Sequence, residues 1–349
     1  MLFEQIAAGG CQSYLIGCPQ TCAGALIDPE ISQIDRYQAL AARHGLRFHY
    51  VIDTHTHADH FSATQQIAHL LRVPIAMHQA CPQPFVDIRL GDRELIVLGR
   101  LRIQVHHTPG HTQDSMCLLV EDRVFTGDTL LIGATGRTDL PTGDPAALYD
   151  SLFNVLLRLD PALMVFPAHD YKGRSHSTIG QEIATNPRLQ KRDRDEFVEM
   201  MNNLNLSTPT HLTEALRTNM TGGKTVAQLL SDAAARVPFI GLDGLKALSD
   251  ARDPDLIVLD VRERDAYEDG HVPGARLVPR GQLELRVNEE LPDPTRRVIT
   301  VCEFGRISTL AAATLRDLGF TRVVALDGGM KAWREAGFPL ARGKTPFPD

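Results

Sequence analysis

The chain has 349 residues, a formal net charge of −7 and 43% hydrophobic residues. This length exceeds that of a usual single domain, and the hydrophobic content is sufficient for two cores. The acidic balance argues against a nucleic-acid partner, which would need a basic face. No apolar run approaches membrane-spanning length, and residues 1–10 contain no basic residue. We therefore expect no membrane partner and no targeting signal, and the cytoplasm is the default location.

The first predicted elements are strands at 13–16 and 24–27 and an amphipathic helix at 32–44. An apolar run at 49–54 predicts a further strand. It is followed by His55-Thr56-His57-Ala58-Asp59-His60, in which three imidazoles and a carboxylate stand within six residues. Imidazole and carboxylate are the usual protein ligands of zinc, iron and manganese. The segment therefore indicates the floor of a metal site.

The same plan returns farther along the chain, where three short strand-like runs each precede a residue that can bind a metal. The runs are 101–106, 123–126 and 163–166, and the residues that follow them are His111, Asp128 and His169. Helices are predicted between these segments at 63–71 and 145–157. Because α/β folds place their sites at the carboxyl ends of strands, we expect these ligand-bearing segments to meet.

The pattern HxHxDH, followed by His111, Asp128 and His169, resembles the metallo-β-lactamase superfamily over roughly residues 1–230. This resemblance implies an αββα sandwich. Two branches of the superfamily fit the residues. In glyoxalase II-like thiolester hydrolases, seven such ligands hold two metals that share an aspartate and a water. In persulfide dioxygenases, one Fe(II) per chain is held by three residues that correspond here to His57, His111 and Asp128.

Three further segments, 136–139, 167–171 and 186–189, resemble the persulfide dioxygenase pattern and favour that branch. The remaining residues of the hydrolase set would then orient the metal ligands and form hydrogen bonds near the oxygen site. These residues are His55, Asp59, His60 and His169. All seven hydrolase ligands are nevertheless present, so a binuclear zinc site stays open. Fe(II) offers adjacent positions for a persulfide and O2, whereas zinc has no redox change and only activates water.

Both branches bind glutathione derivatives, so the resemblance implies glutathione persulfide as the substrate. With O2 and water, it would yield sulfite and glutathione. Arg137, Tyr171 and Arg188 are candidates to hold the amide and carboxylates of glutathione, because arginine is suited to bidentate contact with a carboxylate. The alternative roles are a salt bridge between Arg137 and Asp139 and a solvated surface position for Arg188.

A connecting region at about 205–240 separates this part from a second domain. We place the boundary after residue 237, which gives domains 1–237 and 238–349. In the second domain, apolar runs at 256–261, 298–301 and 323–326 predict buried parallel strands separated by helices. This is the pattern of an α/β fold with a parallel sheet.

Cys302 follows one of these strands and precedes a helix-like run at 309–317. Successive backbone N–H groups in a loop that opens a helix form an anion cradle, and Arg306 adds positive charge beside it. Such an environment favours the thiolate form of a cysteine. Cys302 and Arg306 are therefore candidate catalytic residues for sulfur chemistry.

Three motifs flank this loop at spacings similar to those of a rhodanese domain, which the segment from about 238 to 345 resembles. The motifs stand at 260–263, 270–275 and 328–333. The resemblance implies a sulfurtransferase that carries sulfane sulfur on Cys302 between thiosulfate and glutathione. The loop departs from many rhodaneses, because isoleucine occupies its sixth position. The preferred sulfur donor or acceptor is therefore open.

Together, these patterns predict a fusion of persulfide dioxygenase and rhodanese. Three alternatives stay open. The first is a zinc thiolester hydrolase with an accessory rhodanese domain, and the second is a dioxygenase whose second domain only binds partners. The third is a sulfur carrier that passes a Cys302 persulfide to a protein. The other five cysteines form no CxxC pair and are expected to be free thiols, and we also allow for a homodimer.

Overall fold

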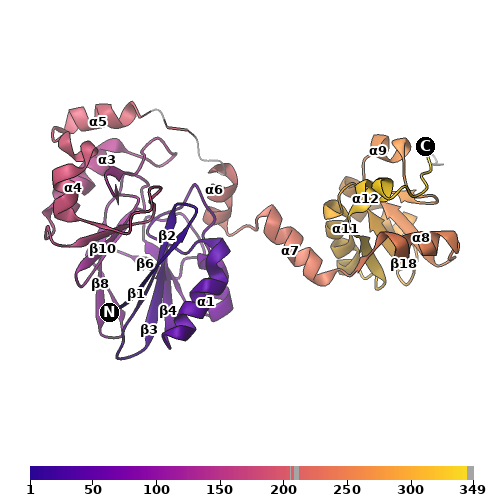
Figure 1. Ribbon diagram of the computed structural model, residues 1–349, viewed down its shortest axis with the longest axis horizontal. Coiled ribbons are helices and arrows are strands. Elements are labelled where there is room, and N and C mark those ends of the chain that lie inside the picture. Colours follow the sequence, from indigo (N-terminus) through magenta and orange to yellow (C-terminus); the bar gives the residue numbers. More distant parts are fainter. Residues whose placement is uncertain (205, 208–211, 344–349) are drawn as a thin grey trace. The chain divides into compact units, whose positions relative to one another are not determined.

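The computed structural model describes residues 1–204, 206–207 and 212–343, so part of the predicted connecting region, residues 205 and 208–211, lies outside the described residues. The chain forms two compact units, Met1–Gly223 and Lys224–Asp349 (Figure 1). The division falls before helix α7 (Val226–Arg236), whereas the predicted boundary falls after it. Helix α7 contacts α11 (Arg306–Asp317) and contributes Ala233 to a core of the second unit.

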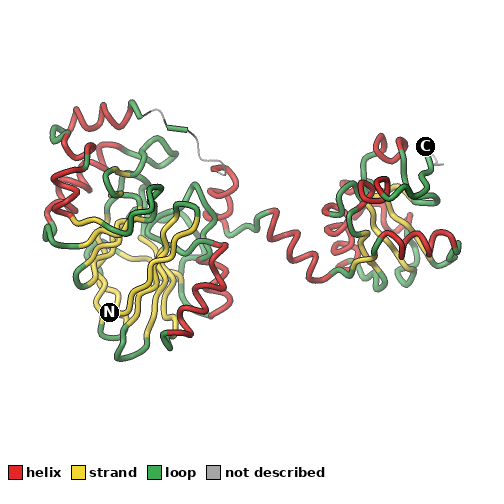
Figure 2. Tube along the Cα trace, in the orientation of Figure 1, coloured by secondary structure: helices red, strands yellow, loops and turns green. Residues whose placement is uncertain are grey.

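Two six-stranded sheets form the centre of the first unit (Figure 2). The first sheet has the order β1-β2-β3-β4-β5-β6, with bounds β1 (Leu2–Ala8), β2 (Cys11–Gly17), β3 (Ala23–Ile27), β4 (Arg47–Ile52), β5 (Ile75–His78) and β6 (Ile88–Leu90). The second has the order β14-β13-β10-β9-β8-β7, with bounds β7 (Leu95–Leu98), β8 (Leu101–His107), β9 (Met116–Val120), β10 (Arg123–Gly127), β13 (Met164–Pro167) and β14 (Ser177–Thr178). A small hairpin pairs β11 (Leu130–Leu131) with β12 (Ala134–Thr135).

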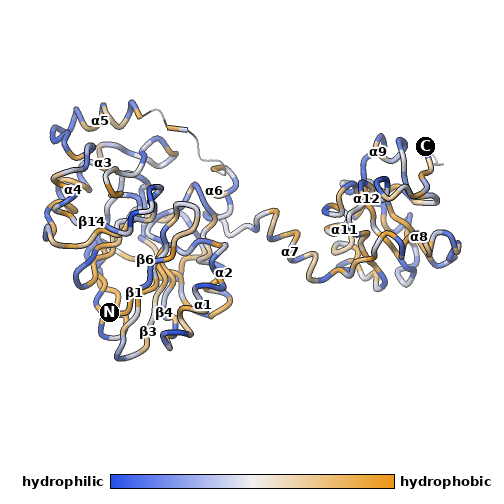
Figure 3. Tube along the Cα trace, in the orientation of Figure 1, coloured by the Kyte–Doolittle hydropathy of each residue, from blue (hydrophilic) through white to orange (hydrophobic). Residues whose placement is uncertain are grey.

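The largest core of the first unit lies between the two sheets. Tyr14 and Ile27 of the first sheet pack in the same buried cluster as Val105 and Phe125 of the second. Strand β3 is buried along its whole length, as expected for a strand with neighbours on both edges and packing on both faces. Figure 3 shows the hydrophobic residues concentrated along these strands. Burial of these two facing surfaces fixes the sheets as adjacent layers.

Helices cover the outer faces of both sheets. Against the first sheet lie α1 (Ile34–Arg43), which follows a 3-10 turn at Ile31–Gln33, and α2 (Thr64–Leu71). Against the second lie α3 (Pro145–Asp150), α4 (Ile179–Thr185) and α5 (Arg194–Asn202). The last helix of the first unit is α6 (Leu212–Thr221). Helix α3 continues through a π-helical turn (Ser151–Val155) and a 3-10 turn (Leu156–Arg158), and another 3-10 turn spans Pro187–Gln190. These layers confirm the predicted αββα sandwich.

The second unit contains a five-stranded parallel sheet with the order β15-β19-β18-β16-β17. Its strands are β15 (Phe239–Ile240), β16 (Leu256–Asp260), β17 (Arg276–Leu277), β18 (Arg297–Val301) and β19 (Val323–Leu326). Its helices, besides α7 and α11, are α8 (Leu242–Asp250), α9 (Arg264–Asp269), α10 (Leu283–Glu290) and α12 (Gly329–Glu335), with a 3-10 turn at Arg280–Gln282. Two separate buried clusters pack helices against the sheet, so the predicted α/β fold is confirmed.

Across the parts of the chain that the structure describes, no helix combines the length and the hydrophobicity that a membrane span requires.

Candidate metal centre and sulfurtransferase loop

A chain of hydrogen bonds fixes the ring of His55, which follows β4 and is 1% exposed. Thr54 donates its backbone N–H to Asp28 Oδ1 (2.6 Å) and its hydroxyl to Asp28 Oδ2 (2.9 Å). The hydroxyl oxygen lies 3.0 Å from His55 Nδ1 and accepts the Nδ1–H, because its own proton is already donated. This tautomer leaves the Nε2 lone pair of His55 available to a cation.

His111 and Asp128 lie beside His55. His111 donates its Nδ1–H to the carbonyl oxygen of Arg137 (2.8 Å), which leaves its Nε2 available as well. Asp128 Oδ2 lies 3.6 Å from His111 Nε2 and 4.0 Å from His55 Nε2. The three potential ligand atoms all lie within 4.8 Å of one another. Two imidazoles and one carboxylate form a ligand set that suits Fe(II) and leaves further coordination positions open.

Two glycines permit this close approach. A Cβ on Gly136 would lie 2.0 Å from the carbonyl oxygen of Asp128 and 3.0 Å from the His111 side chain. Gly127 has a φ of +50°, and a Cβ there would lie 2.5 Å from Thr54 Oγ1. A larger residue at either position would displace a segment that carries a candidate ligand.

The structure does not bring His57 into this group, although the sequence interpretation assigned it as a ligand. His57 Nε2 lies 3.3 Å from Asp28 Oδ1 and 3.7 Å from Asp53 Oδ1. Burial lowers the pKa of His57, but the neighbouring carboxylates of Asp28 and Asp53 outweigh it and raise the pKa well above its ordinary value. The ligand atoms of His57 lie in other groups, with Asp28 and Asp53 and with Asp59 and His60. His55 therefore takes the place beside His111 and Asp128 that the sequence interpretation gave to His57.

Asp59, His60 and His169 lie around Asp128 on another side of the centre. His169 Nδ1 is 2.7 Å from Asp128 Oδ1, and His60 Nδ1 is 3.0 Å from Asp59 Oδ1. Burial raises the pKa of Asp128, but the charge and hydrogen bond of His169 and the other nearby imidazoles hold it well below its ordinary value. Asp128 is therefore ionised, as a metal ligand must be. His169 meets the requirement for a residue that orients this carboxylate.

The centre opens into a cavity of about 1010 Å³, and the three predicted substrate-binding residues line it together with His111 and Asp128. Arg137 is already engaged, because its Nε and Nη2 lie 2.6 and 2.7 Å from the Asp139 carboxylate. Arg188 donates to the carbonyl oxygen of Thr135 (2.6 Å). The ring of Tyr171 is stacked near that of His169, with a centroid separation of 5.9 Å. The cavity therefore offers guanidinium groups for an anionic substrate.

In the second unit, Cys302 directly follows β18, and its sulfur lies at the N-terminal end of α11. The backbone N–H of Ser308 donates to Cys302 Sγ (3.2 Å), and the Ser308 hydroxyl lies 3.3 Å from the same sulfur. Gly305, with a φ of +82°, turns the loop into the helix, and Arg306 is its first residue. The Arg306 side chain is exposed. The helix N-terminus is thus directed at the thiol sulfur, as the sequence predicts.

Charged residues surround the entrance to this loop. Glu303 pairs with Arg334 and with Arg262, whose Nη1 lies 3.3 Å from Glu303 Oε2. Arg262 also pairs with the buried Asp260 (2.7 Å). A Cβ on Gly329 would lie 2.5 Å from the carbonyl oxygen of Cys302, which explains a glycine at the start of α12. The motifs at 260–263 and 328–333 thus hold the cysteine loop in place.

Comparison with known proteins agrees with this architecture. Residues 6–169 match the metallo-beta-lactamase superfamily, and residues 242–336 match the rhodanese-like domain. The mitochondrial persulfide dioxygenase ETHE1 of Homo sapiens is 34% identical over 213 residues, which cover 60% of this chain and 84% of that protein. The chain belongs to the persulfide dioxygenase family. It extends this family's domain with a C-terminal rhodanese domain.

Two further relatives show over how much of the chain the similarity extends. The crystal structure of ETHE1 from Myxococcus xanthus has a TM-score of 0.63 and 38% identity, and the match covers 64% of this chain and 100% of that one. A hydroxyacylglutathione hydrolase of Anaeromyxobacter dehalogenans is 40% identical, but the match covers only 42% of this chain and 57% of that protein. The similarity to the persulfide dioxygenases therefore extends over more of both chains.

Sequence reasoning missed several residues at the persulfide dioxygenase centre. Asp28 and Asp53 determine the environment of His57, and the sulfur of Cys11 lies within 4.8 Å of ligand nitrogens of His60 and His169. Cys11 belongs to none of the motifs, and it lies far from the histidine segment in the sequence. A backbone bridge between Cys11 and His169 brings the two together, and a single sequence contains no direct signal of such a bridge.

Proposed function

We propose that the first unit is an Fe(II)-dependent persulfide dioxygenase that converts glutathione persulfide, O2 and water into glutathione and sulfite. The second unit transfers sulfane sulfur between thiosulfate and glutathione through a persulfide on Cys302. The single observation that carries the first assignment is the group His55, His111 and Asp128, which combines two imidazoles and one carboxylate at the edge of a large cavity.

The tautomers of the two histidines support the assignment to a metal. Both Nδ1 atoms are engaged, one with the Thr54 hydroxyl and the other with the Arg137 carbonyl, so each Nε2 is available as a ligand. Iron bound to this group would supply neighbouring positions for the persulfide sulfur and O2 and the redox change that the oxidation requires. The chain holds the Asp128 carboxylate in place through His169.

The cavity residues support a glutathione-type substrate. Glutathione carries two carboxylates, and Arg137 and Arg188 both line the cavity. Arg137 shares its charge with Asp139, whereas the described contacts of Arg188 are with neutral oxygen atoms of Thr135. Arg188 is therefore the better candidate for a charge-assisted hydrogen bond to a substrate carboxylate. Tyr171, which is 73% exposed, provides an aromatic face at the same opening.

The contacts at Cys302 support the sulfur-transfer assignment. Its sulfur accepts the Ser308 N–H at the start of α11, and the same position would stabilise the negative charge of a thiolate or a persulfide. Transfer requires that Cys302 attack the outer sulfur of thiosulfate and release sulfite. A glutathione thiolate would then attack the outer sulfur of the Cys302 persulfide, which releases the Cys302 thiolate and forms glutathione persulfide.

Elemental analysis of the purified full-length chain, combined with O2 uptake on addition of glutathione persulfide, tests the proposal. We expect about one iron per chain and O2 consumption in proportion to sulfite formed. Full activity with zinc as the only bound metal, or no O2 uptake with the persulfide, would overturn it. Iron removal by a chelator under anaerobic conditions, followed by addition of Fe(II) or Zn(II), distinguishes the two metals directly.

A second candidate function is a binuclear zinc thiolester hydrolase. It is favoured by the presence of all seven hydrolase residues and by a second cluster of potential ligands, His57, Asp59 and His60, near the first. The hydroxyacylglutathione hydrolase relative adds support over part of the chain. This function predicts two zinc ions per chain and cleavage of an acyl-glutathione without O2, so the same metal analysis separates the two candidates.

A further inference from the structure

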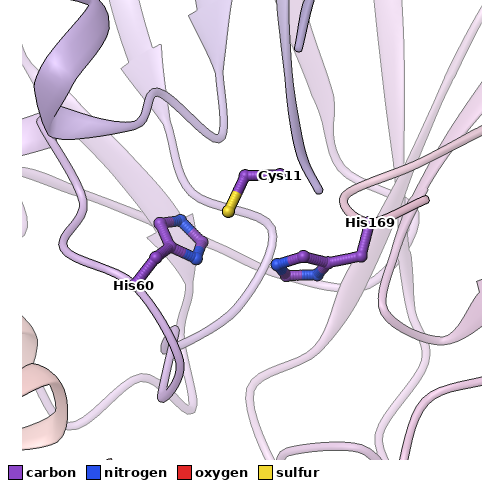
Figure 4. A group of neighbouring side chains, drawn as sticks. All are labelled: Cys11, His60 and His169. Carbon is purple, nitrogen blue, oxygen red and sulfur yellow. The ribbon is translucent and has the colours of Figure 1, made fainter. Parts of the chain in front are cut away.

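Cys11 lines the same cavity as the candidate metal centre, but the proposed oxidation does not use it. Its sulfur and ligand nitrogens of His60 and His169 all lie within 4.8 Å of one another. Figure 4 shows the two imidazole rings pointing toward each other, with the Cys11 sulfur close to both. A thiol, two imidazoles and an open cavity thus come together at one position.

The backbone holds Cys11 firmly at this position. Gln12 donates its N–H to the carbonyl oxygen of Ala168 (2.7 Å), and Asp170 donates to the carbonyl oxygen of Gly10 (2.9 Å). These two bonds flank the bridge between Cys11 and His169. The backbone of Cys11 therefore cannot leave the cavity wall without loss of hydrogen bonds between β2 and the loop after β13.

The two imidazoles leave polar atoms directed at this position. Their Nδ1 atoms contact carboxylates, His60 with Asp59 and His169 with Asp128. Among the residues that the structure describes, the Nε2 atoms of both rings are buried without a hydrogen-bond partner. His169 Nε2 lies 2.9 Å from Asp59 Oδ2, but this approach lacks hydrogen-bond geometry. Buried polar atoms in this state call for a ligand at the cavity surface.

We propose that Cys11 is a second sulfur-accepting thiol of this chain, which takes the terminal sulfur of a low-molecular-weight persulfide that enters the cavity. The donor class rests on the proposed function of the first unit. Cys11 becomes a protein persulfide beside His55, His111 and Asp128. The chain then carries sulfane sulfur at two cysteines, Cys302 in the second unit and Cys11 in the first.

The transfer is balanced without any oxidant. The Cys11 thiolate attacks the outer sulfur of the donor R–S–SH, the S–S bond of the donor breaks, and R–S⁻ leaves with the bonding electron pair. The products are Cys11–S–SH and the donor thiolate, so the sulfane sulfur changes carrier with no net change in oxidation state. N–H groups of His60 and His169 face the sulfur atoms and stabilise the negative charge during the exchange.

The acidity of Cys11 agrees with this role. Burial raises the pKa of its thiol, but the neighbouring imidazoles of His169 and His60 outweigh burial and bring the pKa to about 7. These neighbours favour the thiolate, which is the nucleophilic form of cysteine. Cys22 provides a matched comparison, because it is exposed to solvent and is also a free thiol.

The test uses the full-length Cys302→Ser variant, which removes the sulfur carrier of the second unit. The protein is treated with glutathione persulfide without O2, alkylated and digested, and each cysteine peptide is analysed by mass spectrometry for one additional sulfur atom. We expect Cys11 to acquire this sulfur on the order of tenfold faster than Cys22 at pH 7. His60→Gln should slow the labelling of Cys11 by a similar factor, whereas the exposed-residue variant His69→Gln should not.

Two outcomes overturn the inference: equal labelling of Cys11 and Cys22, and a mixed disulfide of Cys11 with glutathione in place of the additional sulfur. The measurement does not depend on O2 chemistry. Sulfur on Cys11 without any O2 uptake by the wild-type protein would reject the proposed dioxygenase and keep this inference. Normal O2 uptake with unlabelled Cys11 would reject this inference and keep the dioxygenase.

Discussion

His57 Nε2 lies 3.3 Å from Asp28 Oδ1, and this contact gives His57 a different role from His55, which stands only two positions earlier in the sequence. Asp28 also accepts two hydrogen bonds from Thr54, and through the Thr54 hydroxyl it fixes the tautomer of His55. The Asp28 carboxylate therefore pairs with His57 and, through the Thr54 hydroxyl, leaves Nε2 of His55 available to a metal. The difference between the two histidines is a property of the surrounding layers and not of the motif.

His55→Ala should reduce bound iron by about tenfold or more, because it removes one of three ligands from a site in which even indirect partners affect metal affinity this strongly. His57→Gln should retain most of the iron, since its contacts run to Asp28 and Asp53. Elemental analysis after dialysis measures both effects. Circular dichroism serves as the control for folding of the first unit, and the reverse order of iron loss would restore His57 as the ligand.

Much of this fold could be predicted from the sequence because its signals are local. Period-two and apolar runs mark the strands, and the helix at 32–44 shows its buried face through residues such as Tyr37 and Ala41. The position of Cys302 between a strand and a helix likewise depends on adjacent residues. The choice of His55 over His57 and the place of Cys11 depend on Asp28 and on the Cys11–His169 bridge, which only the packed layers bring into contact.

Cys302→Ser should abolish sulfur transfer from thiosulfate, by roughly a thousandfold or more, because the hydroxyl of serine is a far weaker nucleophile than a thiolate. O2 uptake with added glutathione persulfide should be unchanged, since the candidate metal residues belong to the other compact unit. Parallel assays of thiosulfate-dependent transfer and O2 consumption check this. A matched loss of both activities would show that the oxidation also requires Cys302.

Arg188→Ala should raise the KM for glutathione persulfide by roughly tenfold to a hundredfold, which corresponds to about 1.5–3 kcal/mol for a hydrogen bond between charged groups. The kcat should change little, because a carboxylate contact remote from the reacting sulfur acts on ground and transition states alike. Arg137→Ala should have a smaller effect, since Asp139 already pairs with its guanidinium. Steady-state O2 uptake measures both variants, and a larger KM effect at Arg137 would reverse the assignment.

The stacked pair His78 and His107 makes a prediction about pH. The two rings lie 3.7 Å apart at an angle of 10°, and the Ala80 N–H donates to His78 Nδ1. Burial, followed by the charge of His107, lowers the pKa of His78 to about 4. Because this pKa is below the ordinary value of about 6.5, the unfolded chain binds a proton first. The stabilising effect is complete above pH 6.5 and is lost as the pH falls toward 4.

His78→Asn should therefore make the first unit less sensitive to acid, since asparagine cannot gain a proton and its oxygen can accept the Ala80 N–H. The wild-type unit should lose roughly 2 kcal/mol more unfolding free energy than the variant between pH 7 and pH 5. Urea unfolding followed by circular dichroism gives these values. Trp333, the only tryptophan of the chain, lies in the second unit, so its fluorescence transition should be identical in both proteins. Equal acid sensitivity of the variant and the wild type would show that folding does not lower the pKa of His78.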